Sequence, residues 1–167
     1  MRPWSIVIAF GLALAALACD PVHSDAVNAL GDEAAGVRNG PLHRPGQPCL
    51  LCHDGKLGDP NQFSVAGTIY LHPSDTVGLS GVTVTLTGDD GSHATAVTNE
   101  AGNFYLTPSD WTPSFPMQAQ IEYGGTTVTM ATNIGRDGSC AGCHTDPAGP
   151  SSPGRVSVSL EDGGALP

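Results

Sequence analysis

Two copies of a short motif, Cys-x-x-Cys-His, carry the most specific chemistry in this chain of 167 residues. Two thiols at this spacing can add to the two vinyl groups of one haem, while the imidazole that follows binds the iron as an axial ligand. We therefore predict two covalently attached haem c groups. Their thioether bonds are expected at Cys49, Cys52, Cys140 and Cys143, and their first axial ligands at His53 and His144.

The same four cysteines could serve other chemistry, because they also form two Cys-x-x-Cys pairs. Such pairs are suited to a tetrahedral four-thiolate zinc site or to disulfides. A four-thiolate site has no need of the histidine that follows each pair, and the chain begins like an exported protein. We therefore expect haem and keep zinc as the alternative.

The sixth ligand of each iron must come from elsewhere in the chain. The unassigned candidates are His23, His43, His72, His93, Met117 and Met130. Both methionines lie in phase with apolar strand residues and are expected in the core. His93 is expected on the surface and His72 at a strand end. We predict that His23 and His43 bind the irons, because they lie in a polar segment with no core of its own.

Chain stiffness suggests how these two histidines pair with the haems. Prolines between His43 and the first motif hold the intervening chain extended. We therefore expect His43 to cross to the haem of His144, which leaves His23 for the haem of the first motif. The reverse pairing stays open.

The first 18 residues have the features of an export signal. Arg2 gives a short positive region, and the apolar run 6–17 leads into a small-residue box at 16–18. Cys19 follows directly and is the one cysteine outside the motifs, which indicates a bacterial lipoprotein with its lipid on Cys19. The alternative is ordinary cleavage that leaves a free thiol. We expect an exported protein on the periplasmic or cell-surface side, tethered to a bacterial membrane.

The chain is acidic, with 16 Asp and Glu against 6 Lys and Arg and a formal net charge of −10 at pH 7. This charge argues against a nucleic-acid partner. The partners that we expect are redox proteins and, through the lipid, a membrane.

Composition divides the chain into five parts. They are a signal peptide (1–18), a linker with the first haem-binding segment (19–62), a β module (63–132), a second haem-binding segment (133–154) and a terminal strand and tail (155–167). In the linker we expect one short helix that begins at Ser24 or Asp25 and ends at Gly36.

The β module alternates apolar and polar residues, with turn signals between the runs. Val82, Val84 and Leu86 alternate with threonines, which predicts one buried and one exposed face. Gly124 and Gly125 stand where a hairpin needs positive φ. We predict a mainly β fold with little helix, a small antiparallel β-sandwich of six to seven strands. Strands are expected at 63–71, 82–87, 92–99, 103–107, 115–123 and 126–132, with a seventh at 155–160.

The number of strands predicts where the two motifs lie. If consecutive strands run in opposite directions, an even number returns the chain to the end at which it started. Six strands would therefore bring the two haem motifs, which flank the module, into one neighbourhood.

The β module resembles the carboxypeptidase regulatory-like, transthyretin-type module in three stretches. These are Val65-Ala66-Gly67-Thr68-Ile69, Gly81-Val82-Thr83-Val84-Thr85-Leu86 and Thr98-Asn99-Glu100-Ala101-Gly102-Asn103-Phe104. The resemblance implies a seven-strand sandwich that binds or braces and rarely catalyses. The two haem motifs resemble those of c-type multihaem cytochromes.

These features predict a membrane-tethered dihaem electron carrier outside the cytoplasm rather than an enzyme. Two other classes are alternatives. A small haem peroxidase would need an open sixth position on one iron and an acid–base partner above it. A structural or binding module would use haem, or a four-thiolate zinc ion, as a staple.

Overall fold

The computed structural model describes residues 21–33, 37, 40–55 and 61–159. The chain forms two compact units, Met1–Gly31 and Asp32–Pro167. The predicted export signal and the lipid site at Cys19 lie outside the described residues. Within the described ranges, no helix is both long enough and apolar enough to cross a membrane.

In the first unit, helix α2 spans Pro21–Ala29. It begins at a proline, which the first helical position accepts because that residue's amide would have no partner there. The helix is followed by Gly31 at φ +71°, and the amide of Gly31 donates to the carbonyl of Asn28. The helix therefore begins and ends earlier than the sequence predicted, since Gly31 already provides a left-handed C-terminal residue. Gly36 lies outside the described residues.

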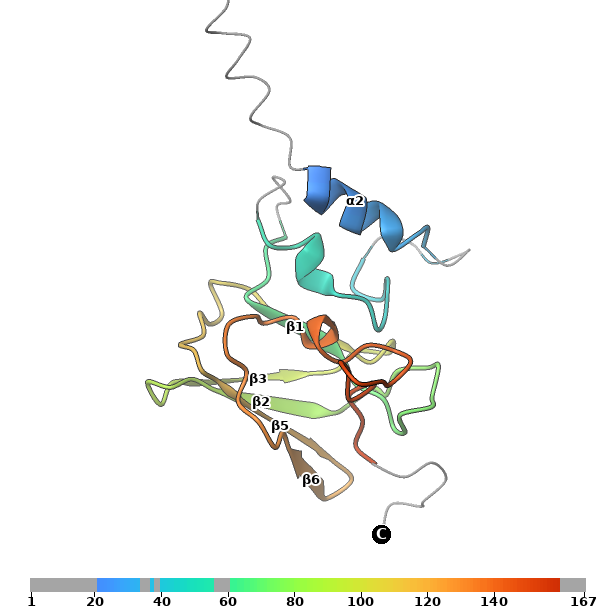
Figure 1. Cartoon of the computed structure of the whole chain (residues 1–167). Coiled ribbons are helices and arrows are strands. Elements are labelled where there is room, and N and C mark those ends of the chain that lie inside the picture. The colour runs from blue at the N-terminus through green and yellow to red at the C-terminus, as the bar shows by residue number, and fades with distance from the viewer. Residues whose placement is uncertain (1–20, 34–36, 38–39, 56–60, 160–167) are drawn as a thin grey trace, which may run out of the picture. The chain divides into compact units, whose positions relative to one another are not determined.

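The described part of the second unit contains six strands, and each falls within a predicted one. They are β1 (Val65–Thr68), β2 (Thr83–Thr87), β3 (His93–Val97), β4 (Asn103–Leu106), β5 (Gln118–Tyr123) and β6 (Thr126–Thr129). They form one sheet of β1 and β4 and a second sheet in the order β3-β2-β5-β6, both antiparallel (Figure 1). The predicted mainly β sandwich with little helix is confirmed.

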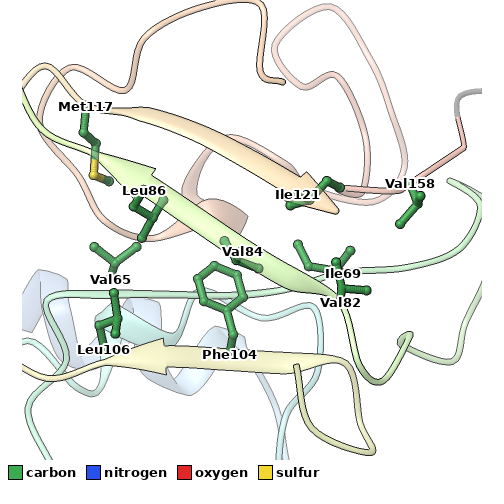
Figure 2. Packing of buried hydrophobic residues seen from close by; sticks show 10 residues of the cluster. All are labelled: Val65, Ile69, Val82, Val84, Leu86, Phe104, Leu106, Met117, Ile121 and Val158. Carbon is green, nitrogen blue, oxygen red and sulfur yellow. The ribbon is translucent and has the colours of Figure 1, made fainter. Parts of the chain in front are cut away.

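The core lies between the two sheets. Figure 2 shows Val84 and Leu86 of β2 and Ile121 of β5 meeting Phe104 and Leu106 of β4. Alternation on β2 is as predicted, because its apolar side chains are buried while its threonines are half-buried or exposed. Burial of this apolar surface is the main favourable term that holds the two sheets together.

The hairpin that joins β5 to β6 follows from two glycines. Gly124 and Gly125 have φ values of +57° and +82°. A two-residue turn with positive φ at both central positions matches the twist of antiparallel strands, and glycine adopts it at low cost. This predicted turn is confirmed.

The predicted seventh strand is present only as a bridge. Ser157 pairs with Tyr70 in parallel, and the amide of Tyr70 donates to the carbonyl of Val156 over 2.9 Å. Val158 is buried in the core. The segment thus pairs with the residues that follow β1, although no regular strand is formed over 155–159.

Candidate functional site

The two Cys-x-x-Cys-His motifs fold into the same tight turn. Short 3₁₀ helices, η1 (Cys49–Leu51) and η2 (Cys140–Gly142), open the two motifs. The amide of His53 donates to the carbonyl of Cys49 over 3.0 Å, and that of His144 donates to the carbonyl of Cys140 over 2.9 Å. Residues three apart in such a turn lie on one side of it. Each turn therefore presents its two thiols together, as attachment to one haem requires.

The two motif histidines also make matching hydrogen bonds. Nδ1 of His53 donates to the carbonyl of Asn61, and Nδ1 of His144 donates to the carbonyl of Gly154, each over 2.9 Å. A carbonyl accepts only, so Nδ1 carries the proton and the lone pair of the neutral imidazole is on Nε2. Metal-binding histidines are commonly oriented by a bond of this kind. In both rings, Nε2 is therefore the nitrogen whose lone pair could bind a metal.

Strand β1 holds both motifs in one neighbourhood. Helices η1 and η2 both contact β1, and Figure 1 shows their teal and orange coils beside it. Ser139 pairs with Ala66 of β1 in a parallel bridge, and the amide of Phe63, just before β1, donates to the carbonyl of His53. The neighbourhood predicted from the number of strands is confirmed.

The first thiol of each motif is largely shielded from solvent. Burial, followed by the neighbouring thiol of Cys49, raises the pKa of Cys140 to about 12. Burial also raises the pKa of Cys49. The thiol of Cys143, in contrast, belongs to an exposed residue. Two thiols with raised pKa values are not the activated thiolates of a redox-active cysteine pair. Burial therefore keeps the thiols of Cys49 and Cys140 protonated at neutral pH.

The four motif cysteines do not converge on a zinc-like centre. In the part of the chain that the structure describes, no three His, Cys, Asp or Glu side chains gather closely enough to hold a metal ion. All four thiols belong to that part, and each is free of disulfide bonds. A haem iron would need only one motif histidine and a sixth ligand, and four-thiolate zinc stays the alternative.

One further feature fits a bound group at the second motif, and another explains how Cys140 packs against the sheet. The hydroxyl of Ser139, next to Cys140, is buried and has no hydrogen-bond partner among the residues that the structure describes. Buried polar groups are rarely left unpaired, and a bound cofactor or a water would supply the partner. Gly67 leaves room for Cys140, because a Cβ at Gly67 would lie 2.7 Å from the Cys140 sulfur.

His43 lies beside the first motif. Its ring centroid is 5.8 Å from that of His53. Between His43 and the motif the chain turns back, since Gly46 has φ +78° and the amide of Gln47 donates to the carbonyl of Arg44. The prolines therefore do not carry this segment away from its own motif. The structure thus places His43 beside His53, whereas chain stiffness predicted that His43 would cross to the haem of His144; which iron it binds stays a prediction.

The other ligand candidates are placed as follows. His23 lies on α2 in the first unit, and its role as a ligand stays a prediction. Met117 is buried in the core, as predicted, whereas Met130, which was also expected there, is only half-buried and lies outside the core cluster. His93 is exposed on β3, and His72 is half-buried in the loop after β1.

A group of residues that the sequence did not single out positions the first motif. Ala66 pairs with Tyr105 and Thr68 with Asn103 across β1 and β4. These residues alternate with Phe104, which faces the core. Asn103 and Thr68 both bond to the segment that carries His43. A polar residue such as Asn103 inside an otherwise core-forming strand is the signal that could have indicated this second face.

Comparisons of the chain with protein-family models, with curated proteins and with solved structures find no match.

Proposed function

We propose that the protein is a dihaem c-type cytochrome that transfers electrons outside the cytoplasm. The observation that supports this most directly is the repeated geometry of the motifs. Two turns of equal form present paired thiols, and in each a carbonyl that accepts from Nδ1 assigns the lone pair of the ring to Nε2. An accidental Cys-x-x-Cys-His sequence would have no reason to reproduce this arrangement twice.

The attachment chemistry is an addition without loss of electrons. The S–H bond of each cysteine breaks, its sulfur bonds to one carbon of a vinyl group, and the hydrogen goes to the other carbon. Cys49 and Cys52 would hold one haem and Cys140 and Cys143 the other. When bound, each haem supplies a one-electron iron couple.

The rest of the chain would hold the two groups in place. The carbonyls of Asn61 and Gly154 fix the rings of His53 and His144. Strand β1 braces both turns, which keeps the two attachment sites near one another for transfer of an electron between them. The net charge of −10 favours redox partners with a basic docking face.

Export and membrane tethering complete the proposal. Residues 1–18 would direct export, and lipid on Cys19 would anchor the protein to a bacterial membrane on its periplasmic or cell-surface side. The two electron-carrying groups would then stand close to membrane-bound donors or acceptors.

The test is to express the full chain with its own signal in a host that attaches haem c, and to measure its intact mass and spectra. The expected mass includes two haems. One haem should be lost when Cys49 and Cys52 are both replaced by Ser, and the other when Cys140 and Cys143 are both replaced by Ser. As a matched control, His93→Ala keeps both, because His93 is exposed. A chain that carries zinc and no covalent haem would overturn the proposal.

A further inference from the structure

His43 and His53 stand at a distance that suits a metal between them. Their ring centroids are 5.8 Å apart and their planes are inclined by 55°. Two imidazoles that bind one metal through Nε2, at about 2 Å each, have ring centroids about 6 Å apart. Rotation of the rings about a shared axis allows any angle between their planes, so the observed inclination is compatible with this arrangement.

His43 is oriented in the same way as the two motif histidines. Its Nδ1 donates to the carbonyl of Gly40. As for His53 and His144, a carbonyl partner on Nδ1 assigns the lone pair to Nε2. Three histidines in this unit thus share one tautomer, with the proton on Nδ1, and two of them belong to the haem motifs.

The segment that carries His43 is fixed to the sheet by hydrogen bonds from two buried residues. Asn103 donates through Nδ2 to the carbonyls of Pro41 and His43, over 3.2 and 3.1 Å. Thr68 accepts from the amide of Gly46 and donates to Oδ1 of Asn103, both over 2.7 Å. Both Thr68 and Asn103 are buried. Fully paired buried networks define one conformation, so the position of His43 is set by β1 and β4.

The facing histidine is held by aromatic stacking. The ring of His53 stacks on Phe63 at 4.4 Å, and Phe63 stacks on Tyr105 of β4 at 4.6 Å. With its Nδ1 bond to Asn61, this stack leaves the ring of His53 little rotational freedom. The sheet therefore positions both imidazoles of the pair.

We infer that His43 is the sixth ligand of the iron bound by His53, and that Asn103 and Thr68 are positioning residues for it. The inference rests on the proposed haem attachment. It assigns to the first haem two axial histidines from one short stretch of chain and leaves the second haem with a ligand from elsewhere.

The test uses two single-haem forms of the full chain. One has Cys140 and Cys143 replaced by Ser and keeps the first haem; the other has Cys49 and Cys52 replaced by Ser and keeps the second. His43→Ala is introduced into each. In the first form we expect loss of the low-spin spectrum, gain of carbon monoxide binding, and recovery of low spin on addition of imidazole. In the second form we expect no change, and His93→Ala should change neither.

A failure of the inference can be told apart from a failure of the proposed function. If the unmodified chain carries no haem, the proposed function fails. If it carries haem but the first form stays low-spin with His43→Ala, or the second form is the one that changes, only the inference is overturned.

Asn103→Asp tests the positioning role, because it keeps the shape of the side chain and removes its two donors to the His43 segment. We expect increased carbon monoxide binding by the first haem and an unchanged spectrum for the second. The second haem serves as the folding control. Equal effects on both haems, or none on the first, would show that Asn103 does not position the ligand.

Discussion

At the scale of residues, Gly67 is the position at which the sheet and the second motif come closest. A Cβ there would lie 2.7 Å from both Cβ and Sγ of Cys140 and 3.0 Å from Phe104. Two of these neighbours belong to a turn that the bridge between Ser139 and Ala66 holds against β1, so they have little room to move.

Gly67→Ala is therefore expected to destabilise the protein by about 1–3 kcal/mol through overpacking. It should also lower haem occupancy at the second motif more than at the first. Urea unfolding and intact mass measure the two effects. Gly135→Ala is the matched control, because a Cβ there meets nothing within 4 Å. Equal stability of the two variants would contradict the prediction.

The raised pKa of Cys140 predicts how stability depends on pH in the chain without haem. Its folded pKa of about 12 lies above the ordinary value of 9.0, so the unfolded chain loses this proton first as pH rises. Stability is then fully present below about pH 9 and falls progressively toward pH 12. The urea midpoint measured across this range checks the decline. Cys140→Ala should make it shallower, and a steeper or unchanged decline would argue against the burial of this thiol.

At the scale of elements, both faces of the sheet of β1 and β4 make contacts. Its inner face supplies Val65, Phe104 and Leu106 to the core. Thr68 and Asn103 bond instead to the segment that carries His43, and Tyr105 supports the aromatic stack on His53. Because successive side chains of β1 and β4 point to opposite faces, one face of this sheet packs in the core and the other contacts the candidate site.

Thr68→Val tests this second face. The change preserves shape and strand propensity but removes the hydroxyl that pairs with Gly46 and Asn103, which leaves the half-buried amide of Gly46 and the buried Oδ1 of Asn103 without this partner. We expect a loss of stability of about 1–3 kcal/mol, measured by urea unfolding. Thr87→Val, at the exposed end of β2, should change stability by less than about 0.5 kcal/mol. The proposed role fails if both variants behave alike.

At the scale of the whole molecule, the proposed lipid site and the haem motifs lie in different units of the chain. Lipid on Cys19 would hold the protein to a membrane, while the haem motifs and the sheet that braces them belong to the unit Asp32–Pro167. The two functions therefore depend on different parts of the chain.

Cys19→Ala is expected to move the exported protein from the membrane fraction to the soluble fraction, with two haems still attached. Fractionation followed by intact mass measures both. Cys19→Ser is a second variant that removes the lipid site with a smaller change in polarity. Membrane association that persists in both variants would exclude a lipid on Cys19.

Sequence alone determined the local features of this protein. The spacing of Cys49, Cys52 and His53, and of the second motif, is a property of five consecutive residues, and the alternation of Val82, Val84 and Leu86 is a property of one strand. Such patterns depend on neighbours in the chain, which is why the six strands and the hairpin at Gly124 and Gly125 could be predicted.

Only the tertiary structure decided which distant residues meet. The turn at Gly46 returns His43 to its own motif, and the hydrogen bonds that hold it there come from Asn103, 60 residues further along the chain. The prolines before the first motif led us to predict an extended path, because proline restricts only its own backbone and that of the residue before it. Their effect was outweighed by non-local hydrogen bonds from buried side chains, which contribute only after the sandwich has brought β1 and β4 together.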